Sequence, residues 1–218
     1  MTTLPPTLAA LLLAASTASA TITIDTVLVG DAGNAADGTG YGAVAYDYRI
    51  GTHEVTNSQY TAFLNAVAET DTHSLYNSSM GSDTNNGGIT QAGNSGSYTY
   101  SVKDGFADKP VNYVSFYDSA RFANWLMNGQ PSGSQGSGTT EDGFYSFDGT
   151  TNIISEASHS SSQVNGINWV AVASEDEWYK AAYYDGNGGY YDYPTESDQA
   201  PDPSSPTTNA NSANYQKA

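Results

Sequence analysis

Histidines and clustered carboxylates are the side chains of this chain whose types could support catalysis or metal binding. The histidines lie at separations that match no ligand spacing, either with one another or with nearby carboxylates. They are His53, His73 and His159. The sequence also lacks the G-x-S-x-G elbow of a serine hydrolase and the glycine-rich motifs that hold phosphates. We therefore assign no catalytic residue.

Three consecutive carboxylates, at positions 175–177, are explained by the start of a helix rather than by acid–base chemistry. Ser174 precedes Glu177 by three residues, so each side chain can accept a hydrogen bond from the other's backbone N–H. Negative charge is also favourable in the first turn of a helix. The pattern predicts a helix that begins at Ser174 and ends before the glycine-rich stretch 186–189, with a short buried strand at 170–172 before it.

Two more helices are predicted from the same kind of start. One begins at Thr56, which can form a capping box with Gln59, and extends to about residue 69. Its apolar side chains recur at helical spacing and are read as core. They are Tyr60, Phe63, Leu64 and Val67. The other helix begins at Ser115, with Asp118 three residues later, and its apolar stripe is wide enough to imply burial on two sides.

Alternation of apolar and polar side chains predicts short strands in the rest of the chain. They cover residues 22–29, 44–48, 98–102, 144–147 and 153–154. In the glycine-rich turn 30–42, acidic and amide side chains do not match the spacing of an EF-hand loop, so a solvated turn is favoured over a calcium site. The polar segment 70–108 is either a surface feature or a mobile lid, and the sequence allows both.

Three blocks resemble the family of formylglycine-generating enzymes, also called sulfatase-modifying factors. Residues 174–182, SEDEWYKAA, are similar to the family motif (T/S)-E-x-E-W-E-x-A-A. Residues 50–65 and 110–126 resemble, in the same order, the family's first and second helices. The resemblance covers most of residues 41–193 and implies an α+β, C-type-lectin-like fold with few helices, irregular sheets and long loops.

Some positions depart from the family pattern. Ala171 and Ala173 stand where the family usually has arginine and proline, and Phe116 replaces a common tryptophan. The blocks that agree are scaffold helices, so they argue for the fold rather than for an activity.

The resemblance also implies an activity that this sequence does not support. Members of the family oxidise a cysteine of a client sulfatase to formylglycine, with a copper ion held by cysteines in the C-terminal half of the domain. The chain contains no cysteine, and thiolates are the ligands that select Cu(I), so copper is not expected. Two interpretations follow: a non-catalytic binding or structural module, or a fragment of the oxidising enzyme whose catalytic half lies beyond residue 218.

Calcium is a further cofactor that the resemblance implies. One structural site of the family uses an asparagine side chain and the next residue's carbonyl in an Ala-Asn-hydrophobic segment, which residues 213–215 resemble. Asn214 and Tyr215 are therefore expected to form part of a calcium site. Calcium needs six to eight oxygen ligands, so a plain polar tail is the alternative. A third functional interpretation is a calcium-stabilised surface protein without a small-molecule ligand.

Composition limits the location and the partners. Residues 1–20 contain a short apolar run and small residues suited to signal peptidase, so we expect a cleaved signal peptide, a secreted, periplasmic or cell-surface protein, and one domain over 21–218 whose C-terminal part is missing. No segment is long enough to span a membrane. The 23 acidic and 6 basic residues give a net charge of −17, which makes nucleic acid and anionic membranes poor partners.

Tyrosine is the remaining compositional anomaly, with 17 residues in the chain. Five of them gather near the C-terminal end of the predicted third helix. They are Tyr183, Tyr184, Tyr190, Tyr191 and Tyr193. Aromatic rings bind sugars and proteins, so the expected partner is an extracellular protein or glycan, contacted through Tyr190 and Tyr191. The favoured alternative is that these rings pack beneath loops.

Overall fold

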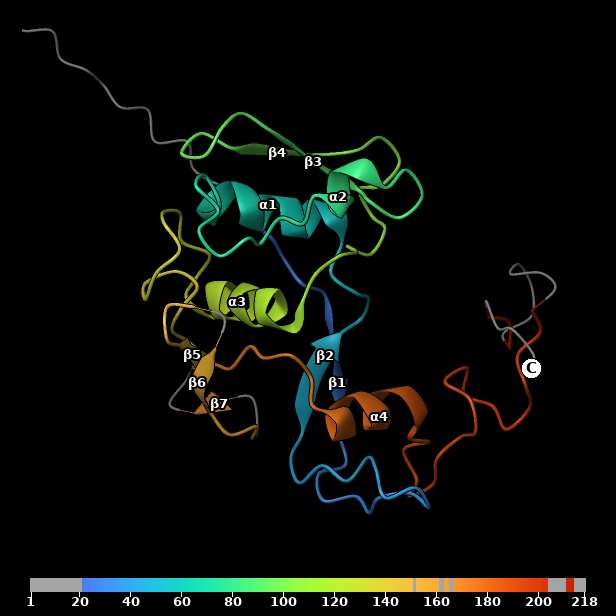
Figure 1. Cartoon of the computed structure of the whole chain (residues 1–218). Helices are drawn as coiled ribbons and strands as arrows, with labels where there is room; N and C mark the ends of the chain where they lie inside the picture. The colour runs from blue at the N-terminus through green and yellow to red at the C-terminus, as the bar shows by residue number, and fades with distance from the viewer. Residues whose placement is uncertain (1–20, 151, 161–162, 165–166, 204–210, 214–218) are drawn as a thin grey trace, which may run out of the picture.

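The structure is a computed structural model that describes residues 21–150, 152–160, 163–164, 167–203 and 211–213. Figure 1 shows short helices and hairpins joined by long irregular segments. Within these residues there is no helix long and apolar enough to cross a bilayer.

The architecture of the described residues is mixed α+β, as the resemblance implied. The helices are α1 (Asn57–Val67), α2 (Ser79–Ser82), α3 (Phe116–Met127) and α4 (Glu175–Tyr183). The strands are β1 (Thr26–Val29), β2 (Tyr48–Gly51), β3 (Ile89–Ala92), β4 (Thr99–Val102), β5 (Tyr145–Phe147), β6 (Ile153–Glu156), β7 (Gln163–Val164) and β8 (Ile167–Asn168). Consecutive strands pair antiparallel as two-stranded sheets, β1 with β2 and so on to β7 with β8.

The starts of the three long helices are confirmed. Thr56, Ser115 and Ser174 each accept a 3.2 Å hydrogen bond from the backbone N–H three residues later. The side chain of that later residue accepts from the cap's own N–H in return, which completes three capping boxes. Each box satisfies N–H groups that have no partner inside the helix, so these local sequences fix where the helices begin.

The core is divided by α3, which lies between α1 and the β5–β6 hairpin (Figure 1). On one side, Phe122 and Trp125 contact Phe63 of α1, with ring centroids 5.3 and 5.2 Å apart. On the other side, Ala120 and Ala123 pack against the buried aromatic residues of the hairpin region. The wide apolar stripe of α3 is therefore buried on two sides, as predicted.

Segment 70–108 contains more structure than the sequence predicted. It includes α2 and β3, and β3 pairs with the predicted strand β4. Asn65 of α1 donates a 2.9 Å hydrogen bond to the carbonyl of Tyr100 and accepts a 3.0 Å bond from its N–H. Because this side chain completes the backbone bonding of β4, the β3–β4 hairpin is attached to α1 as a packed surface layer.

The strand predicted at 170–172 is wrong. The segment is a half-buried connection from β8 to α4 without ladder partners. The N–H of Val172 instead donates to the hydroxyl of Tyr145, at 3.1 Å. The valines pack against the second part of the core, which explains their apolar character without a sheet. The strand predicted at 44–48 is also displaced. β2 begins only at Tyr48, and Val44 is buried but lies before the strand.

Candidate functional site

Glu177 in the first turn of α4 is a hub between three parts of the chain. Its carboxylate accepts from the N–H of Ser174 at 2.8 Å, from the hydroxyl of Tyr46 at 2.8 Å and from Nδ1 of His159 at 2.9 Å. The hydroxyl of Tyr48 donates to its backbone carbonyl. The side chain is buried. Glu177 therefore forms the predicted capping box, and it also connects α4 to two other segments of the chain.

The tyrosines at the hub stay protonated. Burial, followed by the hydrogen bond to Glu177 and its negative charge, raises the pKa of Tyr46 well above its usual value. Burial, followed by the charge of Glu177, likewise raises the pKa of Tyr48. Both phenols therefore act as donors over the physiological range. Alternation places Tyr46 and Tyr48 on one side of a predicted strand, but no pattern in the sequence indicates that they contact α4.

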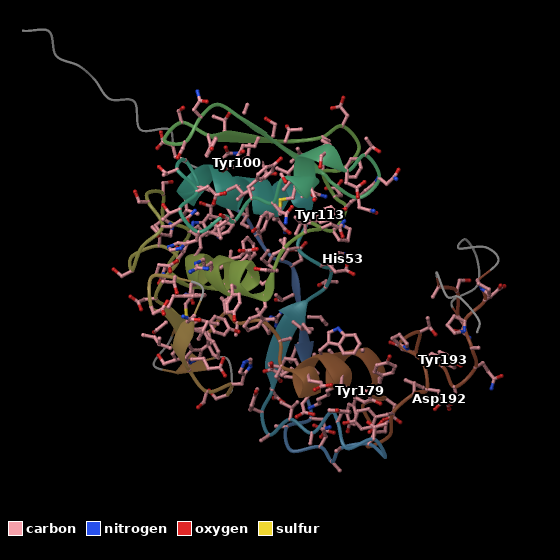
Figure 2. All side chains as sticks on the ribbon, viewed as in Figure 1. His53, Tyr100, Tyr113, Tyr179, Asp192 and Tyr193 are labelled. Carbon is pink, nitrogen blue, oxygen red and sulfur yellow. The ribbon has the colours of Figure 1, made fainter. Side chains whose placement is uncertain are left out.

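The three histidines lie in three separate places. His159 pairs with Glu177, and Nε2 of His73 lies 3.5 Å from the carboxylate of Glu141. Glu141 is also held by Arg121, through bonds of 2.7 and 2.9 Å. His53 is exposed in the turn after β2 (Figure 2). Across the described residues, no group of three or more histidine, cysteine or acidic side chains is arranged to hold a metal ion.

A cluster of rings lies beside this hub, and we call it the tyrosine platform. It consists of Tyr41, Tyr179, Tyr183, Tyr184 and Tyr190, linked by centroid distances of 4.8 to 5.9 Å. Figure 2 places Tyr179 on α4, with Tyr193 further along the C-terminal segment. Three of the five residues noted in the sequence cluster, Tyr183, Tyr184 and Tyr190, belong to the platform.

The platform holds the turn 30–42 against α4. The hydroxyl of Tyr190 accepts from Nδ2 of Asn34 at 2.6 Å and lies 2.8 Å from the carbonyl oxygen of Gly42. Tyr179 donates to the carboxylate of Asp37 at 2.5 Å. Gly42 has a φ of +91°, and a Cβ there would lie 2.5 Å from the Tyr190 hydroxyl oxygen. Only glycine fits this approach.

These contacts support the packing interpretation for Tyr190. Tyr190 is half-buried and its hydroxyl is committed to the turn, as the packing alternative anticipated. Hydrogen bonds from Thr39, and then from Tyr179, lower the pKa of Asp37, so its carboxylate stays charged. Most residues of the turn are exposed, as expected for a solvated turn, and the bonds of Asn34 and Asp37 attach it to the platform.

Two large rings at this site remain open to solvent. Trp178 is 54% exposed and Tyr41 is 41% exposed. The other rings of the platform are half-buried. Trp178 contacts the ring of Tyr183 edge-on at 6.1 Å, and Tyr41 contacts Tyr179 at 5.9 Å. The carboxylate of Asp176 lies in the same region and accepts from the N–H of Gly42 at 2.9 Å. Flat exposed rings beside fixed carboxylates suit a ligand with apolar faces and hydroxyl groups.

Calcium and copper are the two metals that the family resemblance raises. Asn214 and Tyr215 lie outside the described residues, so the partial calcium site is untested. For copper, the donor set does not fit, because none of the 218 residues supplies a thiolate.

Comparison with known protein families gives a match over most of the chain. A family model described as FGE-sulfatase, the sulfatase-modifying factor enzyme 1-like domain, matches residues 17–218. No curated protein and no solved structure matches the chain.

Proposed function

Because the chain belongs to the FGE-sulfatase family of sulfatase-modifying factor enzyme 1-like domains, and because it contains no cysteine, we propose that it is a non-catalytic binding module of that family. The absence of the catalytic cysteine pair carries this proposal. Oxidation of a sulfatase cysteine depends on thiolate-bound copper in the family, and no residue of this chain supplies a thiolate. Family membership also implies the lectin-like fold, which is a scaffold that presents loops to ligands.

The ligand that the surface favours is a glycan, or a glycan-bearing extracellular protein. Trp178 and Tyr41 offer exposed ring faces on which the apolar face of a sugar can stack. Asp176 and Asp37 supply carboxylates that accept hydrogen bonds from hydroxyl groups. The predicted signal peptide at residues 1–20 supports a secreted, periplasmic or surface location, where such ligands occur.

A glycan array probed with the whole chain tests this function. The Trp178→Ala and Tyr41→Ala variants are expected to lose at least tenfold in affinity for any glycan that binds. Phe116→Ala and Tyr117→Ala are matched controls, because these rings are 52% and 41% exposed at a different place. They are expected to bind as the parent does. An array without signal for a folded protein, or equal losses in all four variants, argues against the proposal.

The competing interpretation, a piece of the oxidising enzyme, has a separate test. The chain is incubated with copper and a sulfatase peptide that contains the target cysteine, and aldehyde is measured by mass spectrometry. We expect none from these 218 residues. Aldehyde formation by this chain overturns the non-catalytic proposal. Aldehyde formed only by a longer product of the same gene instead assigns the oxidase site to residues beyond 218.

Calcium binding at Asn214 and Tyr215 stays a prediction of the same family membership. Isothermal titration with calcium is expected to give a weak signal, because two oxygen ligands are far fewer than the six to eight that calcium takes. Asn214→Ala is expected to remove that signal, whereas Asn209→Ala, a matched amide in the same tail, is expected to retain it. A signal unchanged by Asn214→Ala places calcium elsewhere.

A further inference from the structure

The β5–β6 hairpin has one unpaired edge. Tyr145 of β5 directs both backbone groups away from β6: its N–H donates to the side chain of Asn124 at 3.0 Å, and its carbonyl accepts from that side chain at 2.8 Å. Tyr145 lies opposite Glu156 in the antiparallel register. This is therefore a non-hydrogen-bonded pair, in which the N–H and carbonyl of Glu156 also point away from the partner strand. They face the outer edge of β6.

Nothing in the described part of the chain pairs with that outer edge. The sheet contains β5 and β6 alone. The register shift between Ser146 and Phe147 adds an extra residue to β6 and bends it. Folded proteins usually protect such edges with charge, bulges or covering segments, because exposed backbone donors and acceptors invite another strand. β6 carries a bulge and one carboxylate, yet its backbone remains accessible.

An open groove of about 410 Å³ runs along this edge. It is lined by residues 152–156 and by Phe116 and Tyr117 from the start of α3. Ile154 is 67% exposed, more than any other large apolar side chain that the structure records as exposed, and Phe116 is 52% exposed. Their exposure is contiguous along one groove, which is unlike the scattered apolar residues of an ordinary surface.

We propose that the outer edge of β6 binds an extended, basic peptide segment of another protein, which adds as a third strand. The backbone groups of Glu156 require a partner with free N–H and carbonyl groups, which an extended peptide has. Alternate apolar side chains of that peptide lie over Ile154 and Phe116, in keeping with the two-residue period of a strand. This surface is separate from Trp178 and Tyr41, so it is an interaction beyond the proposed glycan binding.

The negative charge of the groove and of the whole chain indicates that the bound peptide is basic and belongs to another protein. Glu156 lines the groove and is exposed. The chain as a whole carries a net charge of −17, so a lysine-bearing or arginine-bearing segment is attracted, and a second copy of the chain is repelled.

The test uses a fluorescein-labelled peptide of alternating lysine and valine, titrated with the whole chain and followed by fluorescence anisotropy. The control peptide has the same sequence and charge but carries N-methyl groups on alternate residues, so that one of its edges cannot donate. We expect saturable binding of the first peptide and at least tenfold weaker binding of the second. Equal binding of both peptides means adsorption by charge and overturns the proposal, as does the absence of saturation by the parent peptide up to 1 mM.

Variants of the edge separate backbone pairing from charge. Glu156→Pro removes the outward N–H while leaving the bonds to β5, and Ile154→Ser removes the apolar side chain from the groove without changing the charge. Each is expected to weaken binding at least tenfold, whereas Glu156→Gln retains the N–H and is expected to lose only about threefold. If Glu156→Pro unfolds the hairpin, Ile154→Ser and the N-methylated peptide still test the proposal. Dimerisation of the chain that Ile154→Ser abolishes assigns the edge to a second copy and overturns the proposal.

Discussion

At the residue scale, buried charge in this protein is held by specific partners. Glu141 and Arg121 form a two-bond ion pair, and Lys180, which is 1% exposed, donates to the carbonyl of Asp31 at 2.9 Å. Glu177 has donors from three parts of the chain. Each arrangement compensates for lost hydration with hydrogen bonds, so that removing one partner leaves a buried polar group unsatisfied.

Glu177→Gln is expected to lower the free energy of unfolding by about 1–3 kcal/mol, because charge-assisted bonds to His159 and Tyr46 become neutral ones. Urea unfolding followed by circular dichroism measures the change. Glu175→Gln is the matched control in the same helical turn, since Glu175 is exposed, and a change within about 0.5 kcal/mol is expected there. Equal effects of both substitutions mean that Glu177 contributes only through the helix dipole.

His73 makes stability depend on pH below neutrality. Burial, with the charge of Arg121, lowers its pKa although the carboxylates of Glu141 and Asp71 oppose the shift. The folded protein therefore binds this proton less readily than the unfolded chain does. The stabilisation is present above the unfolded pKa of about 6.5 and is lost as the pH falls from there toward the folded pKa.

His73→Gln is expected to flatten this dependence, measured as the difference in urea midpoint between pH 7.0 and pH 5.5. His53→Gln is the control, because His53 is exposed, and it is expected to retain the full difference. A pH dependence that survives in His73→Gln assigns the titration to another group.

At the element scale, helix starts were predictable because their determinants are local. Ser174 and Glu177 are three residues apart, and the same holds at the other two caps. Strands were harder to predict, because strand pairing depends on residues that are distant in the sequence. The apolar alternation at 170–172 comes from packing against the second part of the core, and this segment pairs with no other strand. β3 was not predicted, because the polar residues around it show no alternation. The predicted hairpin of β5 and β6 succeeded because its apolar side chains flank a short turn.

Asn124 joins α3 to β5 and is fully buried. Its amide donates to the carbonyls of Thr140 and Tyr145 at 2.8 Å and accepts from the Tyr145 N–H. Asn124→Ala leaves these three buried groups without a partner, so we expect a loss of about 2–4 kcal/mol in the free energy of unfolding.

Asn128→Ala is the matched control for that loss. Asn128 lies one turn further along the chain and also bonds two carbonyls, but it is exposed, so water can replace its amide. The expected cost is about 1 kcal/mol, again from urea unfolding. If the two variants lose the same stability, burial is not what makes Asn124 important.

At the scale of the whole molecule, the candidate site is an assembly of segments that are far apart in the sequence. Tyr46 is hydrogen-bonded to Glu177, which lies 131 residues away in the sequence, and Asn34 is hydrogen-bonded to Tyr190, which lies 156 residues away. Composition revealed the excess of tyrosine, and the resemblance gave the family, but neither could give these contacts. They depend on how the turn 30–42 folds over α4, which is set by tertiary packing. Trp178 was noted only as part of a motif, and its exposure became visible only in the fold.

Net charge is the other property of the whole molecule, and it predicts a response to salt. Raising NaCl from 10 to 150 mM shortens the Debye length from about 30 Å to about 8 Å, which screens the repulsion among 23 acidic side chains. The buried Arg121–Glu141 pair is little affected, because it is shielded from solvent. We therefore expect the free energy of unfolding to rise by roughly 1 kcal/mol.

The urea midpoint at the two salt concentrations measures this response, and CaCl₂ at equal ionic strength is the control. If screening is the whole effect, both salts raise the midpoint equally. A larger rise with calcium that Asn214→Ala removes indicates a specific site in addition to screening. A midpoint that falls in NaCl contradicts the prediction, because local ion pairs would then outweigh the repulsion of the whole charge.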